Sequence, residues 1–273
     1  MLRRILSEYK SGNLSLDDAE KMIRLLALKE IESACLDISR EARKGIPEIV
    51  LAEGKDTQSL IQIAAAFLEE SGWVLITRIS GEKMESLKAA IDPSFQIKYS
   101  ARGRVASISK PPGPAREMLG RVALFTAGTS DLGVAEEARF ILEEMGCSTH
   151  LYRDVGIAGL HRVFPALKDS IEMDVDAIIV FAGMEGALAS VVSSLAPIPV
   201  IGVPTSSGYG YGGKGVAALM AMLQSCAPGL LVVNIDNGVG AAVAAATISR
   251  LRWQGSCLRK SRFAGETCQH EGE

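Results

Sequence analysis

A chain of 273 residues with a formal net charge of −3 lacks the basic excess that binding to nucleic acid or to an acidic membrane requires. Hydrophobic residues make up 48% and charged residues 22%, the balance of a globular protein with one large domain or two smaller ones. Its five cysteines are odd in number and show no framework spacing, which favours the reducing cytoplasm. The first residues, MLRRILSEYKSGNLS, contain no long apolar run, so no signal peptide is expected.

The first 114 residues are predicted to form a small mixed α/β domain. Ser15 is an N-cap candidate, with two acids in the next turn, for a helix over 15–31. Further helices are expected at 37–45, 57–72 and 82–91, and strands at 47–54, 73–79, 95–100 and 105–110. The proline-rich segment KPPGPAREMLG, 110–120, is the expected linker.

Residues 115–252 are predicted to form a second domain in which strands and helices alternate. Strands are expected at 121–128, 147–155, 176–183, 198–205 and 229–236, and helices at 129–146, 158–169, 184–196, 215–226 and 237–252. Continuous Val, Ile and Leu runs in an alternating order predict a doubly wound parallel sheet, of the three-layer flavodoxin or Rossmann type. Residues 253–273 are expected to be a flexible polar tail.

Charge almost disappears between residues 181 and 249, where Glu185, Lys214 and Asp236 are the three charged residues. A membrane span is not expected there, because prolines and glycines interrupt the longest uncharged run. Strands buried on both faces, helices of small residues and a subunit interface explain the composition better. The three charges are therefore candidates for function, and a homo-oligomer, a tetramer or an octamer, is expected.

Ligands of doubly wound sheets bind beyond the carboxyl ends of the strands, so the loops there are the candidate site. The first loop holds Gly128, Thr129, Ser130 and Asp131, whose backbone N–H groups suit an anion. The alternative is a simple helix N-cap. The next loop ends in His161 and Arg162, which suit proton transfer and anion binding or form an exposed surface pair.

The third loop places Glu185 directly after a buried strand, with Met184 beside it and Gly183 and Gly186 around them. The glycines allow a ligand to approach the backbone, and the carboxylate is either a general base or a charge at a helix N-terminus.

The fourth loop, PTSSGYGYGGKG, is either a phosphate loop or a mobile lid, with Lys214 near its end. It is not a Walker A motif, because Gly215 stands where a hydroxyl residue is required, and no strict GxGxxG supports a nicotinamide-type site. Cys226 follows an apolar helix, where a lone cysteine is either inert packing or a nucleophile. No metal-ligand cluster is evident.

Four of these segments, GTSD, HR, FAGMEGALASVV and PIPVIGVPTSSGYG, resemble the aminoimidazole ribonucleotide carboxylase (PurE) family over 121–252. The histidine of that family's glycine-rich segment falls near Ala187, and Glu185 has no carboxylate counterpart there.

Nearly the whole chain resembles the LarB family, through DISREARKGIPEIVLAEGKD, GTSD, GMEGAL, YGYGGKG and MLQSCAPGL. Members are pyridinium-3,5-biscarboxylic acid mononucleotide synthases of nickel-pincer nucleotide biosynthesis, which serves lactate racemase. The resemblance implies carboxylation by CO2 of carbon 5 of the pyridinium ring in nicotinic acid adenine dinucleotide, and hydrolysis of its phosphoanhydride with release of AMP.

The resemblance also implies roles for individual residues. Cys226 would be the covalent nucleophile and Glu185 the acid/base, while Ser130 and Asp131 would position the incoming carboxyl group. Substrate binding would fall to Gly128, Thr129, His161, Arg162, Gly183, Met184, Gly186 and Lys214. No tightly bound cofactor is expected, although Mg²⁺ would assist hydrolysis of the anhydride. A purine-type carboxylase or mutase, and a non-catalytic nucleotide-binding module, are the alternatives.

Overall fold

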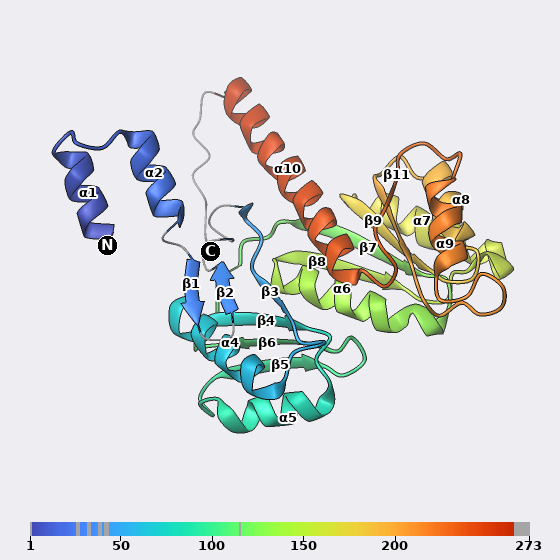
Figure 1. Ribbon diagram of the computed structural model, residues 1–273. Coiled ribbons are helices and arrows are strands. Elements are labelled where there is room, and N and C mark those ends of the chain that lie inside the picture. The colour runs from blue at the N-terminus through green and yellow to red at the C-terminus, as the bar shows by residue number, and fades with distance from the viewer. Residues whose placement is uncertain are drawn as a thin grey trace. The chain divides into compact units, whose positions relative to one another are not determined.

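The computed structural model describes residues 2–25, 28–31, 34–37, 40, 44–114 and 116–264 (Figure 1). The chain divides into two compact units, one of Met1–Tyr99 with Val105–Pro114 and one of Ser100–Arg104 with Ala115–Glu273. The change at 114–115 falls in the proline-rich segment, and the short stretch Ser100–Arg104 belongs to the second unit.

The N-terminal unit combines short helices with mixed β structure. Its elements are α1 (Leu2–Lys10), α2 (Leu16–Leu25), β1 (Leu28–Ile31), β2 (Ala34–Asp37), β3 (Ile49–Leu51), α4 (Thr57–Glu70), β4 (Trp73–Thr77), α5 (Gly81–Ala90), β5 (Gln96–Ser100) and β6 (Val105–Ser109). β1 and β2 form an antiparallel pair, and the other strands form a sheet in the order β3-β4-β6-β5. β3 runs parallel to β4, and β6 antiparallel to it, so the sheet contains both strand directions.

Capping residues and burial explain where these elements begin. Asp56 accepts a hydrogen bond from the Ser59 amide at 2.8 Å and so starts α4, while Ser80 accepts one from the Lys83 amide and starts α5. β4 and β6 are buried along their whole length, as central strands of a small sheet are.

One prediction for this unit is wrong in part, and a second falls largely on residues that the structure does not describe. The helix predicted over 15–31 was wrong beyond Leu25, because residues 28–31 pair as a strand, with Leu28 opposite Asp37 and Ile31 opposite Ala34. Cross-strand pairing overrides the helical spacing there. The helix expected at 37–45 falls largely on residues outside the described ranges.

The C-terminal unit is a five-stranded sheet in which every strand is parallel, which confirms the predicted fold class. Its strands are β7 (Gly120–Thr126), β8 (Cys147–Tyr152), β9 (Ala177–Ala182), β10 (Val200–Pro204) and β11 (Leu230–Val232), in the order β11-β10-β9-β7-β8. Its helices are α6 (Leu132–Glu144), α7 (Val163–Glu172), α8 (Ala187–Leu195), α9 (Val216–Leu223) and α10 (Gly238–Ala264).

The helices cover the two faces of this sheet. α6 and α10 pack on each other and on β7, whereas buried residues of α7, α8 and α9 share a core with β9 and β10 (Figure 1). Phe125 and Phe181, on the neighbouring strands β7 and β9, are among the largest fully buried side chains. Burial on both faces explains why these strands are continuous apolar runs.

Helix α10 continues to Ala264, past residue 253, where a flexible tail was expected. The stretch 253–264 contains no proline and only one glycine, so nothing in its sequence stops the helix. Residues 265–273 lie outside the described part. No helix among the described residues has the length and hydropathy that a membrane crossing requires.

Strand order determines where a ligand can bind. The chain leaves β7 for β8 at one edge of the sheet and then crosses to β9 on the other side of β7. The carboxyl ends of β7 and β9 are therefore the topological switch point, where the connecting loops diverge and leave a crevice.

Candidate functional site

A cavity of about 270 Å³ lies at this switch point. Four loops build it, and they follow β7, β8, β9 and β10. Its walls are formed by Ala127, Gly128, Ser130, Asp131, Gly156, Ile157, Ala158, Ala182, Gly183, Met184, Glu185, Gly186, Ala187, Leu188, Ser207 and Tyr209. Seven residues predicted for the site are among them: Gly128, Ser130, Asp131, Gly183, Met184, Glu185 and Gly186.

Asp131 forms hydrogen bonds to two of the loops that line the cavity. Its side chain is only 2% exposed. Its carboxylate accepts hydrogen bonds from the Gly128 amide at 2.9 Å, the Thr205 hydroxyl at 2.6 Å and the Ser207 hydroxyl at 2.7 Å. These donors come from the loops after β7 and β10, so a single buried carboxylate joins two loops and fixes the wall of the cavity.

The loops after β9 and β10 approach so closely that side chains would not fit between them. A Cβ atom at Gly183 would lie 2.4 Å from the Ser207 hydroxyl oxygen, and one at Gly208 would lie 2.6 Å from the Met184 amide nitrogen. Both distances are below any real contact, so the two loops can cross only with glycine at both positions.

Glu185 contributes a solvent-accessible carboxylate to the cavity. The residue is exposed and lies in the turn between β9 and α8. Its carboxylate makes no hydrogen bond or ion pair within the part of the chain that the structure describes. Met184 beside it has φ +44°, a left-handed conformation that is uncommon for a side chain of this size. Glu185 is therefore accessible to a ligand, in contrast to the enclosed Asp131.

Four predicted substrate-binding residues lie near the cavity but do not line it. Thr129, His161 and Lys214 are exposed. Arg162 ends the 3₁₀ segment Ile157–Arg162, whose first residues line the cavity, and its guanidinium pairs with Asp154. These four residues are therefore not part of the cavity wall.

Cys226 lies away from the cavity of its own chain. It follows α9 and precedes β11, so it sits where the strands begin, whereas Glu185 follows β9, where they end. β10 alone spans five residues, which separates the two edges of the sheet by about 16 Å. Ser190 and Ser193 of α8 hydrogen-bond to Ser225 and Pro228 and hold this loop.

The two free cysteines that the structure describes differ in environment. Cys226 is exposed, whereas Cys147 is buried at the start of β8. Burial, with a smaller effect from Asp176, raises the pKa of the Cys147 thiol to about 12. Cys147 therefore stays protonated and unreactive at neutral pH, and of these two thiols only Cys226 is open to a reagent.

Sequence analysis missed Thr205, Ser207 and Tyr209 as site residues. The signal was present, because hydroxyl residues directly after a buried strand lie at the same sheet edge as Asp131. The sequence pattern instead predicts a loop of the phosphate-binding or lid type for these residues. Their partner could not be identified, since Thr205 and Ser207 lie 74 and 76 residues from Asp131 in the chain.

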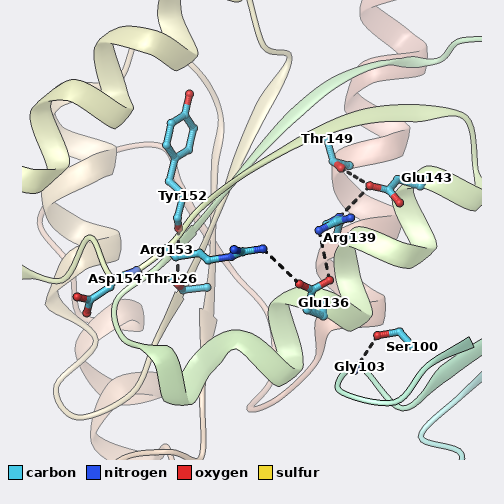
Figure 2. Close-up of polar contacts among 10 residues, drawn as sticks. All are labelled: Ser100, Gly103, Thr126, Glu136, Arg139, Glu143, Thr149, Tyr152, Arg153 and Asp154. Carbon is cyan, nitrogen blue, oxygen red and sulfur yellow. Dashed lines mark hydrogen bonds and ion pairs between the residues drawn. The ribbon is translucent and has the colours of Figure 1, made fainter.

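The loop after β8 is held by a separate set of polar contacts, shown in Figure 2. The buried Thr126 hydroxyl accepts a hydrogen bond from the Asp154 amide at 3.2 Å and contacts the Tyr152 carbonyl oxygen. Nearby, Arg139 pairs with Glu143 at 2.9 Å and with Glu136 at 3.5 Å on the surface of α6. The Thr126 contacts fix the segment that leads to Gly156 and Ile157 in the cavity wall.

Thr205→Val is expected to lower the free energy of unfolding by about 1–3 kcal/mol, because it leaves a buried carboxylate short of one donor. Thr149→Val is the matched control, since the Thr149 hydroxyl donates to Glu143 at 2.7 Å on the surface (Figure 2). Urea unfolding curves of the two variants give the comparison. Equal losses would contradict the role assigned to the Asp131 contacts.

The described residues contain no group of three His, Cys, Asp or Glu side chains placed to hold a metal ion. Two of the oxygen contacts that a metal would need at Asp131 are already taken by hydroxyl groups. No step proposed below depends on a metal ion.

The chain is similar to known proteins in both halves. Residues 28–110 match the family described as LarB/PurE-like N-terminal domain, and residues 121–259 match the AIR carboxylase family. An uncharacterized protein of Methanocaldococcus jannaschii is 46% identical over 255 residues, which cover 92% of this chain and 97% of that one.

Two further relatives are named N5-carboxyaminoimidazole ribonucleotide mutase. The one from Thermotoga maritima is 31% identical over 140 residues, 49% of this chain and 77% of that protein. The one from Pyrococcus horikoshii is 32% identical over 138 residues, 48% and 73% of the respective chains. With its five-stranded parallel sheet and its switch-point cavity, the chain belongs to the AIR carboxylase family, in the LarB-type arrangement of a LarB/PurE-like N-terminal domain and a PurE-like C-terminal domain.

Proposed function

We propose that this member of the carboxylase and mutase family carboxylates carbon 5 of the pyridinium ring of nicotinic acid adenine dinucleotide. It also hydrolyses the phosphoanhydride, so that AMP and pyridinium-3,5-biscarboxylic acid mononucleotide are released. The observation that carries the proposal is Glu185, an accessible carboxylate in the cavity, while Ala187 stands near the position of the histidine in the purine enzymes.

The chemistry requires a nucleophile before carbon dioxide can react, because a pyridinium ring is electron-poor. We assign this role to Cys226 of a second copy in the expected homo-oligomer, because Cys226 of the same chain lies at the opposite edge of the sheet from the cavity. Addition of its thiolate to the ring forms a C–S bond and leaves a dihydropyridine, whose ring nitrogen donates electrons toward carbon 5. Carbon 5 then attacks CO2 and forms the new C–C bond. The sequence of steps is redox-neutral up to this point, since no electron leaves the ring system.

Glu185 completes the cycle as the general base. It accepts the proton of carbon 5, and the electron pair of that C–H bond restores the conjugated ring as the thiolate leaves. One CO2 is gained and one proton is lost, which balances the carboxylation. The separate hydrolysis adds one water molecule across the P–O–P bond that breaks, and AMP is the leaving group. An accessible carboxylate suits this role, because the proton then has a path to solvent.

The remaining groups have proposed roles in binding. The cavity, at about 270 Å³, is at the small end of ligand sites and suits the pyridinium nucleoside rather than the whole dinucleotide. The rest of the substrate would extend over the loops that carry Thr129, His161, Arg162 and Lys214. Mg²⁺ would arrive with the phosphates, and the reducing cytoplasm would keep the Cys226 thiol available.

A purine-type ribonucleotide carboxylase or mutase is the second candidate, because two relatives carry the name of such a mutase. The two candidates differ in the acceptor of the carboxyl group, which is the pyridinium ring in the first and the imidazole ribonucleotide in the second. Their products differ, and so do the enzymes that would consume them.

The deciding experiment supplies the purified protein with nicotinic acid adenine dinucleotide and bicarbonate. AMP and the dicarboxylated mononucleotide are followed by chromatography, and a covalent adduct by intact-protein mass spectrometry. AMP with the dicarboxylated product is the expected result. No reaction here, with turnover of N5-carboxyaminoimidazole ribonucleotide, would establish the mutase instead.

A further inference from the structure

We infer that Asp236 is a positioning residue of the candidate site, because its carboxylate holds the loop after β10, residues 206–215, with Tyr209 in the cavity wall. The inference rests on the proposed function, since the ring of Tyr209 is placed to recognise the pyridinium ring of the substrate. Asp236 is not among the residues that line the cavity, so it acts through the loop.

Asp236 is a charged residue in a part of the chain that has almost no others. Glu185, Lys214 and Asp236 are the three charges between residues 181 and 249. The proposed reaction gives the first two a role but leaves Asp236 without one. A charge among apolar strands and helices is costly unless it is bonded, so the bonds that Asp236 makes indicate its role.

Asp236 bonds to the beginning of the loop with both its backbone and its side chain. Its amide donates to the Pro204 carbonyl oxygen at 2.9 Å, and its carboxylate accepts a hydrogen bond from the Ser206 amide at 2.8 Å. These bonds extend the contact of the last two strands, because the Val233 amide donates to the Gly202 carbonyl oxygen at 3.1 Å. The carboxylate therefore supplies an acceptor to the loop where the strand pairing ends.

A second carboxylate holds the same part of the loop. The hydroxyl groups of Thr205 and Ser207 donate to Asp131, in the loop after β7. The amide of Ser206, between them, donates to Asp236, in the loop after β11. Since β7 and β11 lie on opposite sides of β10 in the sheet, the beginning of the loop is fixed from both sides.

The end of the loop is packed against the segment that follows β11. Gly215 has φ +80°, and a Cβ atom there would lie 2.7 Å from Cγ2 of Ile235 and 3.0 Å from the Thr205 carbonyl oxygen. The Lys214 amide donates to the Gly208 carbonyl oxygen at 3.3 Å and closes the loop on itself. Both ends of the loop therefore meet the segment that carries the carboxylate.

The middle of the loop carries two exposed tyrosines. Tyr209 is 80% exposed and lines the cavity, and Tyr211 is fully exposed. Among the cavity residues that the structure describes, Tyr209 is the only aromatic one. The face of an aromatic ring attracts a cation and stacks on a flat ring, and a pyridinium ring is both. So exposed a side chain takes its position from the loop backbone, so the bonds at the base of the loop determine where the ring lies.

The test compares Asp236→Gly with Asp236→Asn. Asp236 has φ +54°, a left-handed conformation that glycine adopts without strain, so Asp236→Gly removes the carboxylate without straining the backbone. Asp236→Asn keeps a side-chain oxygen that can accept from the Ser206 amide, and asparagine tolerates the same backbone. Asp174→Gly is the matched control, because Asp174 has φ +52° and pairs with Arg252 before β9, at the opposite edge of the sheet from the cavity.

Asp236→Gly is expected to raise KM for nicotinic acid adenine dinucleotide about tenfold, while kcat stays within about threefold of the wild type. The thiol and the general base are unchanged, so the loss concerns binding. Asp236→Asn and Asp174→Gly are expected to keep the wild-type KM. Titration of each protein with the dinucleotide in the absence of bicarbonate gives the affinity directly. A wild-type KM in Asp236→Gly would overturn the inference.

A double-mutant cycle tests whether Asp236 acts through the tyrosine. Tyr209→Ala changes an exposed side chain, so it is expected to fold and to raise KM about tenfold as well. In that background Asp236→Gly is expected to raise KM by less than about twofold further. Effects that multiply fully would contradict the inference. So would a wild-type KM in Tyr209→Ala, a result that decides even if Asp236→Gly does not fold.

A readout without substrate separates the inference from the proposed function. Chymotrypsin cleaves after tyrosine, and cleavage after Tyr209 or Tyr211 is followed by mass spectrometry. Asp236→Gly is expected to be cut there at least about fivefold faster than the wild type, Asp236→Asn and Asp174→Gly, because a released loop opens to the protease. Equal rates would overturn the inference whether or not product forms. Wild-type protein that forms no product would instead reject the proposed function.

Discussion

Cys226→Ser is expected to lower formation of the dicarboxylated mononucleotide by about a thousandfold or more, with dinucleotide affinity close to that of the wild type. A serine hydroxyl is far less acidic than a thiol, so almost none of it is ionised at neutral pH and it cannot add to the ring. Because Cys226 is exposed, the substitution buries no unsatisfied polar group, and the variant is expected to fold normally.

The measurement combines a product assay with a binding titration and a mass spectrum of the intact protein. The adduct of substrate mass should be absent from Cys226→Ser. Cys147→Ala is the control, because the pKa of that buried thiol is about 12 and it cannot act as a nucleophile. Turnover that persists in Cys226→Ser would end the covalent mechanism.

Glu185→Gln is expected to lower kcat by about 100- to 10,000-fold, the range that general acid–base catalysis supplies. The glutamine amide keeps the size of the side chain but cannot accept the proton from carbon 5. Adduct formation precedes this step, so the covalent species on Cys226 should accumulate. This accumulation distinguishes the variant from Cys226→Ser, in which no adduct forms at all.

Glu172→Gln is a suitable control for the loss of one exposed carboxylate, since Glu172 ends α7 and does not line the cavity. Its kcat is expected to equal that of the wild type. An inactive Glu185→Gln variant with no accumulated adduct would show that Glu185 acts before the ring is attacked, and not as the base.

Local pattern was sufficient for most of the fold. The five strands of the C-terminal sheet coincide with apolar runs, as in AIIVFA of β9, because strands buried on both faces need apolar side chains at every position. Local pattern failed where a distant partner decides the structure. Residues 28–31 continue a helical pattern but form a strand because β2 lies beside them.

The candidate site shows the same division. The loops GTSD and FAGMEG could be assigned from their positions after buried strands, and Asp131 and Glu185 do line one cavity. The hydroxyl groups that bond Asp131 could not be assigned, because a spacing of more than seventy residues is visible only after the sheet forms. The distance of Cys226 from the cavity depends on strand direction, which the motif alone does not contain.

The hydrogen bonds of Asp131 have a consequence for folding during synthesis on the ribosome. A ribosome delivers Asp131 well before Thr205 and Ser207, so a nascent chain that ends before β10 contains an acidic side chain without its buried partners. Closing so long a loop carries an entropic cost that only the assembled sheet offsets. A shortened chain that keeps β7, β8 and β9 therefore lacks Ser207 and Tyr209, the part of the cavity wall that follows β10.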